Sequence, residues 1–354
     1  MSAVVLIKAP TRGPDDVDAL KVLAAGGFLA SDVLAVVAKT EGNGCVNDFS
    51  RTLSARSWHD VLPPGVVTVM SGGTEGVLSP HATLVVRVGE DAPPSGLAGA
   101  AGATAAIAKG DLGRRAHVNQ VAAVVRETVA AAGLRDEDVH LVLVKCPLLT
   151  SDDVADCVAS GVEPVTVDTY ESMARSRGAT ALGVALALGE CGDDDVDAAL
   201  TSGVEAWSAV ASVSSGAETQ NCQVLVLGAS GTAGRFRIAH TVMRDAMDAD
   251  AVLGVLGSFG DIPTRVVQIF AKAEASPDGT IRGRRHTMLT DSDVPSTRHA
   301  RAAVGGLLAG LSGDPCLYVS GGAEGQGPPG GGPVAVVVEL TDPTGAPAPD
   351  ASPA

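Results

Sequence analysis

The chain has 354 residues, a length that predicts about two or three domain-sized units. Acidic residues outnumber basic ones by 41 to 25, and the resulting net charge of −16, with no polybasic run, argues against nucleic-acid binding. Hydrophobic residues make up 45% of the chain, which excludes a disordered protein. We find no signal-peptide pattern and no uncharged apolar run of about 18 residues, so we expect a cytoplasmic protein with no membrane partner. The six cysteines show no CxxC spacing, which predicts reduced core residues and argues against a zinc cluster.

Apolar runs that end in lysine occur three times along the chain. An Ala-rich helical pattern over Asp18–Ala25 precedes a strand pattern over Val33–Ala38, which Lys39 closes. The same order returns in the middle of the chain, with a helix over Val118–Ala132 and a strand over Val139–Val144. Lys145 closes that strand, and Lys272 closes a third run over Val266–Ala271. Gly27 and Gly133 follow the two helical patterns and are predicted to be helix C-caps.

Serine–glycine corners form a second recurrence. Ser71-Gly72 follows the strand-like run VVTVM, and Ser320-Gly321 follows CLYV. Between them, VLVLGA leads into Ser230-Gly231. The sequence therefore predicts that each repeat holds one strand that ends in lysine and a later strand that ends in Ser-Gly.

Arginine marks the same place in each repeat. The stretches that begin at Arg177 and Arg301 align over fourteen positions, and each predicts a helix. Arg51 lies 20 residues before Ser71, close to the 19 that separate Arg301 from Ser320. We therefore expect three copies of one α/β unit, namely 1–100, 111–246 and 247–341, followed by a disordered tail over 342–354. The acidic and then Ser-rich stretch 191–221 is interpreted as an excursion inside the second unit.

Three lysines, three serines and three arginines would meet if the units pack about a pseudo-threefold axis. A buried lysine crowded by arginine has a lowered pKa and can activate serine, while arginine can hold carbonyl oxygens of a substrate. A glycine after the serine allows backbone N–H groups to approach an oxyanion. This combination suits acyl transfer on an amide. Taken singly, the same residues favour other roles, since a lysine at a strand end is usually solvated, Ser-Gly is usually a turn, and Arg51 alone suits a surface ion pair.

Other kinds of site find little support in the sequence. It has no Walker A, HExxH or GxSxG motif, and its seven histidines lack the spacing of zinc ligands. Residues 325–330 fit GxGxxG nominally, but prolines lack the N–H donors of a dinucleotide loop. The Gly/Pro-rich loop 325–333 offers carbonyl oxygens, which suit Mg²⁺ or Ca²⁺, although such a pattern more often forms a rigid turn.

Taken together, these strings resemble the cyanuric acid hydrolase/barbiturase family of ring-opening cyclic amide hydrolases. The resemblance covers nearly the whole chain. It is carried by KTEGNGCVNDFSR (39–51), SGGTEG (71–76), VKCPLLT (144–150), SRGATALGVALALGE (176–190), GRRHTMLTDSD (283–293), TRHARAAVGG (297–306) and VSGGAEGQGPPGGGP (319–333). It implies a barrel-like α/β fold in which three repeated units around a pseudo-threefold axis enclose one site, and it implies a homotetramer.

The resemblance also implies roles for individual residues. The middle unit would carry the reacting pair, with Ser230 as nucleophile and Lys145 as its base. The remaining substrate contacts would be Lys39, Ser71, Gly72, Lys272, Ser320, Gly321, Gly231, Arg51, Arg177 and Arg301. Arg298, one helical turn from Arg301, is the alternative to it. A structural Mg²⁺ or Ca²⁺ would be held by Glu274 and by atoms of Ala323, Gln326, Gly327, Pro328, Pro329 and Gly331. No catalytic cofactor is implied.

Three equivalent sets of side chains suit a planar ring with three evenly spaced carbonyls. We therefore expect cyanuric acid as the substrate, opened through an acyl-enzyme to carboxybiuret. Barbituric acid shares the three carbonyls but has carbon at one ring position, so barbiturase activity, or hydrolysis of another cyclic imide, is the alternative. A small-molecule sensor that binds the ring without consuming it is the alternative outside enzymes; it would not need lysines buried beside the serines.

Overall fold

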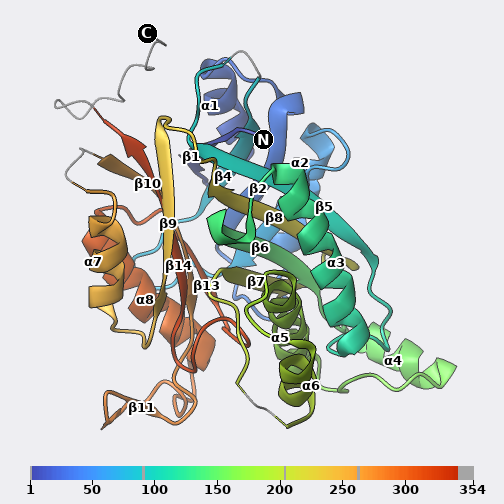
Figure 1. Cartoon of the computed structure of the whole chain (residues 1–354). Helices are drawn as coiled ribbons and strands as arrows, with labels where there is room; N and C mark the ends of the chain where they lie inside the picture. The colour runs from blue at the N-terminus through green and yellow to red at the C-terminus, as the bar shows by residue number, and fades with distance from the viewer. Residues whose placement is uncertain (1, 90–91, 203–204, 261–263, 342–354) are drawn as a thin grey trace.

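The structure is a computed structural model that describes residues 2–89, 92–202, 205–260 and 264–341. Its main strands form three four-stranded sheets, each from one continuous stretch of chain (Figure 1). The first sheet contains β1 (Val4–Pro10), β2 (Val33–Thr40), β3 (Val67–Gly72) and β4 (His81–Arg87). The second contains β5 (Leu97–Ala106), β6 (Val139–Pro147), β7 (Ala211–Gly216) and β8 (Asn221–Ala229). The third contains β9 (Phe236–Met243), β10 (Thr264–Ala273), β13 (Tyr318–Gly321) and β14 (Gly332–Leu340). The two-residue strands β11 (Thr280–Ile281) and β12 (Arg284–Arg285) form a hairpin.

All three sheets share one topology. In each, the spatial order is first, fourth, second, third strand, as in β1-β4-β2-β3. The fourth strand runs antiparallel to both of its neighbours, and the second and third strands run parallel. Helices α1 (Ala19–Ala25) and α2 (Phe49–Val61) belong to the first sheet. Helices α3 (Arg115–Ala132), α4 (Ser151–Ser160), α5 (Thr169–Ala187) and α6 (Asp193–Ser202) belong to the second, and α7 (Ala249–Gly257) and α8 (Ser296–Ser312) to the third.

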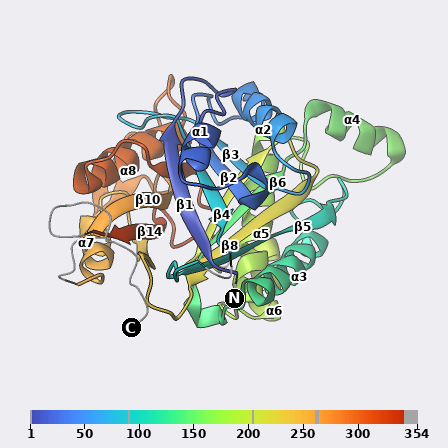
Figure 2. The same ribbon diagram turned by 90° about the horizontal axis from the view of Figure 1, so that it is seen from above.

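The sheets are buried on both faces, which explains why their central strands are continuous apolar runs. One face of every sheet contributes to a shared core, to which Leu34, Leu143 and Phe270 belong. The other face packs against the sheet's own helices in a separate core, and helices such as α3, α7 and α8 lie at the periphery (Figure 2). Within the described residues the three sheets remain separate and do not close into the barrel that we expected.

Several predicted elements are confirmed. The three strands that end near lysine are β2, β6 and β10, and the two Ala-rich patterns form α1 and α3. Helix α3 ends at Gly133, whose φ of 72° is the left-handed conformation that glycine adopts without strain. At α1, by contrast, the capping residue is Gly26 and not the predicted Gly27.

The predicted unit boundaries are wrong by one strand. Strand β5 pairs with β8 of the second sheet, so it does not belong to the unit that was predicted to end at residue 100. Strand β9 pairs with β14 of the third sheet, although it precedes residue 247. Neither strand ends in lysine or Ser-Gly, so nothing in the repeat pattern marked them as first strands. The expected tail, 342–354, lies outside the described residues.

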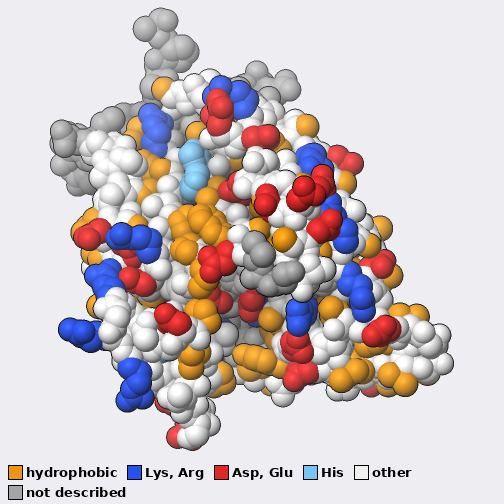
Figure 3. All heavy atoms as spheres, turned by 60° about the horizontal axis from the view of Figure 1, so that its bottom comes forward, with side chains coloured by type: hydrophobic (Ala, Val, Ile, Leu, Met, Phe, Trp, Pro, Cys, Tyr) orange, Lys and Arg blue, Asp and Glu red, His pale blue; other side chains and the backbone are white. Residues whose placement is uncertain are grey.

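The stretch 191–221 is not an irregular excursion. It contains helix α6 and strand β7, which is the third strand of the second sheet. Elsewhere, acidic and basic side chains are interspersed on the face shown in Figure 3, in agreement with the absence of a polybasic run. Among the described residues, no helix has the length and apolar character needed to span a membrane.

Candidate active site

In each sheet the lysine at the end of the second strand lies beside a serine at the end of the third. The parallel register pairs Lys39 with Ser71 and Lys272 with Ser320, as predicted. In the second sheet the residue paired with Lys145 is Ser214 of β7. Adjacent parallel strands carry their side chains in step, so the three pairs occupy equivalent positions in the three sheets.

The predicted pairing of Lys145 with Ser230 is wrong. Ser230 follows β8, which runs antiparallel to β6. Gly228, two residues before Ser230, pairs with Val139 at the start of β6, whereas Lys145 lies near the other end of that strand. The Ser230 hydroxyl lies 2.8 Å from the Thr232 hydroxyl and does not reach the site. Gly231, the next residue in the chain, lies at the same end of β8 as Ser230. Both residues are therefore removed from the set of substrate contacts.

The three serines surround one small cavity. Its lining comes from all three units and comprises Gly44, Arg51, Ser71, Gly72, Met173, Arg177, Ser214, Ser215, Arg301, Ser320 and Gly321. The three predicted arginines are therefore brought together with the serines. Arg301 lines the cavity and is 3% exposed, whereas Arg298 lies behind it with a third of its side chain in solvent, so the geometry favours Arg301.

The lysines lie beneath the serines and are almost completely buried. The Lys39 ammonium donates to the Ser71 hydroxyl at 3.0 Å, and Lys272 donates to the Ser320 hydroxyl at 3.1 Å. Lys145 has different partners: it donates to the carbonyls of Met70 and Ser215, at 2.8 and 3.2 Å, and its Nζ lies 2.6 Å from Oε1 of Glu218.

Two of the three arginines form forked pairs with a glutamate from another unit. Arg301 donates two hydrogen bonds of 2.7 Å to Glu75. Arg177 makes the same two-pronged contact with Glu324, also at 2.7 Å. Such forked pairs fix the plane of the guanidinium group as well as its position. Arg51 instead donates to the carbonyls of Cys45 and Ser215, at 2.6 and 3.0 Å.

Burial alters the ionisation of the lysines. It lowers the pKa of Lys39 well below its ordinary value, and the charge of Arg301 adds to this effect. The pKa of Lys272 is also lowered well below its ordinary value, by burial and by Arg177. Burial lowers the pKa of Lys145 only to about 8, because Glu218 opposes the shift. Lys145 therefore exchanges its proton near neutral pH, as an acid–base catalyst must.

Of the residues predicted to bind a metal, Glu274 directly follows β10, and the others lie in the loop after β13. Burial raises the pKa of the Glu274 carboxyl, with further help from Glu324, and the carboxylate accepts from the Gly330 N–H at 3.0 Å. One carboxylate with several backbone carbonyls is a donor set that suits Mg²⁺ or Ca²⁺. The Gln326 side chain is already used, since its Oε1 accepts from the Val213 N–H at 2.6 Å. Its contribution would come from the backbone.

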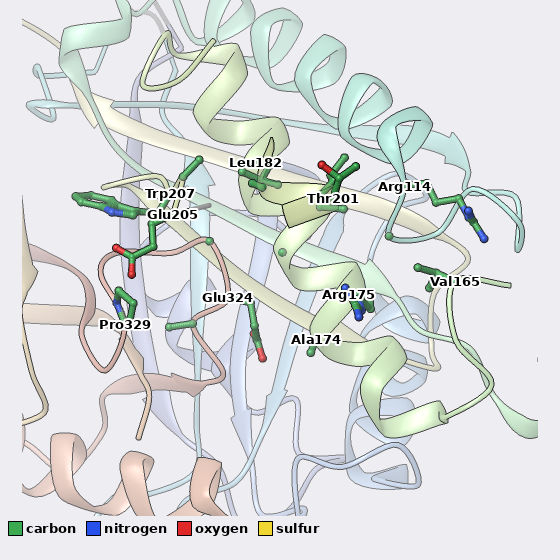
Figure 4. Close-up of a pocket in the computed structure, with 18 of the residues that line it drawn as sticks. Arg114, Val165, Ala174, Arg175, Leu182, Thr201, Glu205, Trp207, Glu324 and Pro329 are labelled. Carbon is green, nitrogen blue, oxygen red and sulfur yellow. The ribbon is translucent and has the colours of Figure 1, made fainter. Parts of the chain in front are cut away.

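A second, larger cavity of about 810 Å³ lies on the other side of α5. Ala174 and Gly178 of α5 line it, whereas Met173 and Arg177 of the same helix line the small cavity. Glu324 stands between α5 and the loop that carries Pro329 (Figure 4). Helix α5 and the Arg177–Glu324 pair therefore form the wall between the two cavities.

The sequence did not identify Ser214, Ser215 or the three glutamates Glu75, Glu218 and Glu324 as site residues. Their signal was present, because a glutamate follows each site serine by four residues in SGGTE, SSGAE and SGGAE. The middle copy has a second serine in place of the first glycine, so its Ser-Gly comes one residue later, and it lies in the stretch 191–221 that we interpreted as an excursion. Tyr318, fully buried, lies with its hydroxyl beside Ser71 and Ser214 and was not singled out either.

Comparisons with known proteins agree with this architecture. The family model described as "Amidohydrolase ring-opening protein" matches residues 5–339. Cyanuric acid amidohydrolases from Pseudonocardia dioxanivorans and a Rhodococcus species are 60% and 54% identical to the chain, covering 96% of it and 99% and 97% of their own lengths. The crystal structure of the cyanuric acid hydrolase from A. caulinodans is similar over 97% of this chain and all of its own, with a TM-score of 0.89 at 46% identity. A second cyanuric acid hydrolase structure, described as an innovation by structural concatenation, gives a TM-score of 0.88 at 42% identity, over 96% of this chain and all of that one.

The match spans all three sheets and includes the strands and helices that carry the serines and arginines of the small cavity and the lysines paired with the serines. It leaves no part of the site outside the aligned region. The chain therefore belongs to the cyanuric acid hydrolase family of ring-opening amidohydrolases, and is a hydrolase that acts on C–N bonds of cyclic amides.

Proposed function

We propose that the protein is a cyanuric acid amidohydrolase in which Ser214 is the nucleophile and Lys145 is its base. The observation that carries this proposal is the register between β6 and β7, which sets these two residues side by side in the position held by Lys39/Ser71 and Lys272/Ser320. The repeated lysine, serine and arginine set supports a substrate with three equivalent carbonyls, arranged about a pseudo-threefold axis.

The proposed reaction begins when the Ser214 oxygen attacks a ring carbonyl carbon and its proton passes to Lys145. The tetrahedral intermediate then collapses as the C–N bond breaks, and Lys145 returns the proton to the departing ring nitrogen. Water attacks the resulting acyl-enzyme, again with Lys145 as base, to release carboxybiuret and regenerate the serine. The lysine must both accept and return a proton, which suits a group whose pKa is about 8.

The other two units would bind the ring. Lys39 and Lys272 already donate to their own serines, which fixes those hydroxyls toward the cavity. The ring oxygens can then be held by the hydroxyls of Ser71 and Ser320 and by the three arginines. The positive charge of the arginines stabilises the oxyanion. Both pairs therefore support the reaction without attacking the ring.

A hard cation in the loop after β13 is a further part of the proposal. Glu274 and the carbonyls of Ala323, Gln326, Gly327, Pro328, Pro329 and Gly331 would hold it. When bound, the cation would neutralise Glu274 and brace the loop that carries Glu324. The homotetramer stays a prediction of the family resemblance, and the cytoplasmic location stays a prediction from the sequence itself.

The test is to incubate the purified protein with cyanuric acid and, separately, with barbituric acid, following the loss of each ring's ultraviolet absorbance. We expect consumption of cyanuric acid, abolished in Ser214→Ala and Lys145→Ala but retained in Ser230→Ala, the matched control. Turnover of barbituric acid alone would overturn the substrate and keep the mechanism. Turnover by Ser214→Ala would overturn the nucleophile, and binding without turnover of either ring would favour the sensor.

A further inference from the structure

Three glutamates occupy equivalent positions, and one of them is bound differently. Glu75 and Glu324 each receive two hydrogen bonds from an arginine of another unit. Glu218 instead lies 2.6 Å from the Lys145 ammonium, and Arg51 stays 3.9 Å from it. The carboxylate that serves an arginine in two units therefore serves a lysine in the third.

The residue three positions before the arginine also differs among the three units. Asp48 precedes Arg51 and lies 3.9 Å from its guanidinium, whereas the corresponding residues are Ala174 before Arg177 and Arg298 before Arg301. Asp48 is fixed as the N-cap of α2, where its carboxylate accepts from the Ser50 N–H. The Arg51 Nε lies 3.9 Å from both Asp48 and Glu218, and the guanidinium donates its hydrogen bonds to two carbonyls, so Arg51 forms no forked pair with Glu218.

The Glu218 carboxylate contacts the Lys145 ammonium. The lysine Nζ donates hydrogen bonds to Met70 O and Ser215 O, and it lies 2.6 Å from Glu218 Oε1 in an ion pair. In the other two units the lysine donates a hydrogen bond to the hydroxyl of its paired serine. Lys145 thus leaves the hydroxyl of Ser214 free of that contact.

We propose that Glu218 is a positioning residue that acts through Lys145: its carboxylate orients the amine beside Ser214 and stabilises the ammonium that forms when the serine loses its proton. This inference rests on the proposed Lys145–Ser214 pair. The Ser214 proton moves to Lys145 and later to the departing ring nitrogen, and Glu218 takes no part in that transfer. Its place resembles that of the carboxylate in a serine–base–acid triad, with lysine as the base.

The direction of the effect follows from the groups that face Lys145. Glu218 and the Cys146 thiol raise the pKa of Lys145, whereas Arg51 lowers it, and burial is the largest influence and also lowers it, to about 8. Lys145 accepts a proton only when it is neutral, so activity rises with pH through this value. Removing the Glu218 charge makes the ammonium less stable and moves that rise to lower pH.

The first experiment measures kcat/KM against pH for wild type, Glu218→Gln and Glu218→Asp. We expect the acid limb of Glu218→Gln to move down by about one pH unit or more and its plateau to fall about tenfold, because a weaker base removes protons less well. Glu218→Asp keeps the charge and should restore the limb toward the wild-type position. The matched control is Glu75→Gln, whose carboxylate meets arginine, and its limb should stay in place whatever happens to KM. An unmoved limb in Glu218→Gln, or an equal shift in Glu75→Gln, would overturn the inference.

A second measurement needs no turnover. The chain has six lysines, so ¹³Cε-labelled lysine gives a simple NMR spectrum in which Lys145→Arg identifies the Lys145 resonance. Its titration should move to lower pH in Glu218→Gln. An unmoved Lys145 titration overturns the role of Glu218 alone, whereas turnover by Ser214→Ala overturns the proposed function and this role together.

Discussion

Arg177 and Glu324 are joined by two hydrogen bonds of 2.7 Å, although 147 residues separate them in the chain. Burial raises the pKa of Glu324, but Arg177 more than offsets this, so the carboxyl keeps a pKa below its ordinary value and stays charged. The pair spans the second and third units at the edge of the small cavity. It fixes an arginine that the proposed mechanism assigns to substrate binding.

Replacing Glu324 by glutamine should therefore weaken substrate binding more than it slows chemistry. The amide cannot accept two hydrogen bonds from a guanidinium in the same way, so Arg177 loses its fixed orientation. We expect KM for cyanuric acid to rise about tenfold with a smaller change in kcat. The control is Glu171→Gln, which breaks an exposed pair with Arg175 on the same helix and should leave both constants unchanged. A lower kcat at unchanged KM would contradict the assigned role.

Gly322 should be required for the same arginine. Its φ is +78°, and a Cβ there would lie 2.6 Å from the Arg177 guanidinium, so Gly322→Ala combines backbone strain with displacement of that side chain. Gly313 is the matched control, because its φ is +73° and a Cβ would meet open space. Both alanine variants should lose about 1 kcal/mol of unfolding free energy. Only Gly322→Ala should also raise KM, and equal kinetic effects of the two variants would argue against a steric role.

Removal of a bound cation should lower thermal stability if Glu274 holds one. A chelator should lower the melting temperature of the wild type by a few degrees, and added Mg²⁺ or Ca²⁺ should restore it, because a ligand bound only to the folded state stabilises that state. Glu274→Gln should show a lowered melting temperature that neither treatment changes. A wild type that is indifferent to chelator and to added cation would remove the metal from the proposal.

The buried histidine His117 should make the protein less stable in mild acid. Burial lowers its pKa to about 4 in the folded protein, against about 6.5 when unfolded, so the unfolded chain binds the extra proton first. The stability that the neutral ring contributes is complete above pH 6.5 and is lost as the pH falls toward 4. At pH 5 the loss is about 2 kcal/mol. Urea unfolding at pH 7 and 5 should show it, and His117→Gln should reduce the difference; an equal difference in the variant would contradict this.

Much of the site could be predicted because its residues recur at strand ends. Lys39 and Ser71 close two apolar runs in one unit, Lys272 and Ser320 do so in another, and the parallel register joins each pair. Parallel strands end at the same edge of a sheet, so a pattern of strand ends was enough to bring these side chains together.

Ser214 could not be found in that way, and Ser230 shows why. VLVLGAS ends an apolar run as convincingly as VVTVMS, but β8 is the fourth strand of its sheet and runs antiparallel to β6. Composition does not reveal the direction of a strand. Ser230 was therefore predicted to lie at the edge of the sheet where Lys145 lies, whereas it lies at the opposite edge. The contacts of Glu218 and Glu324 were also beyond the sequence, since they depend on how one unit is placed against another.

The sharing of arginine and glutamate between units has a consequence for synthesis of the chain. The hydrogen bonds of Arg177 to Glu324 cannot form until Glu324 has been synthesised. The third sheet is incomplete until β14, Gly332–Leu340, pairs with β9 and β10. A nascent chain on the ribosome can thus hold Ser214 and Lys145 in a finished second sheet and yet have no working pocket. If the small cavity acts as proposed, a chain that ends before Glu324 and β14 should be inert instead of partly active.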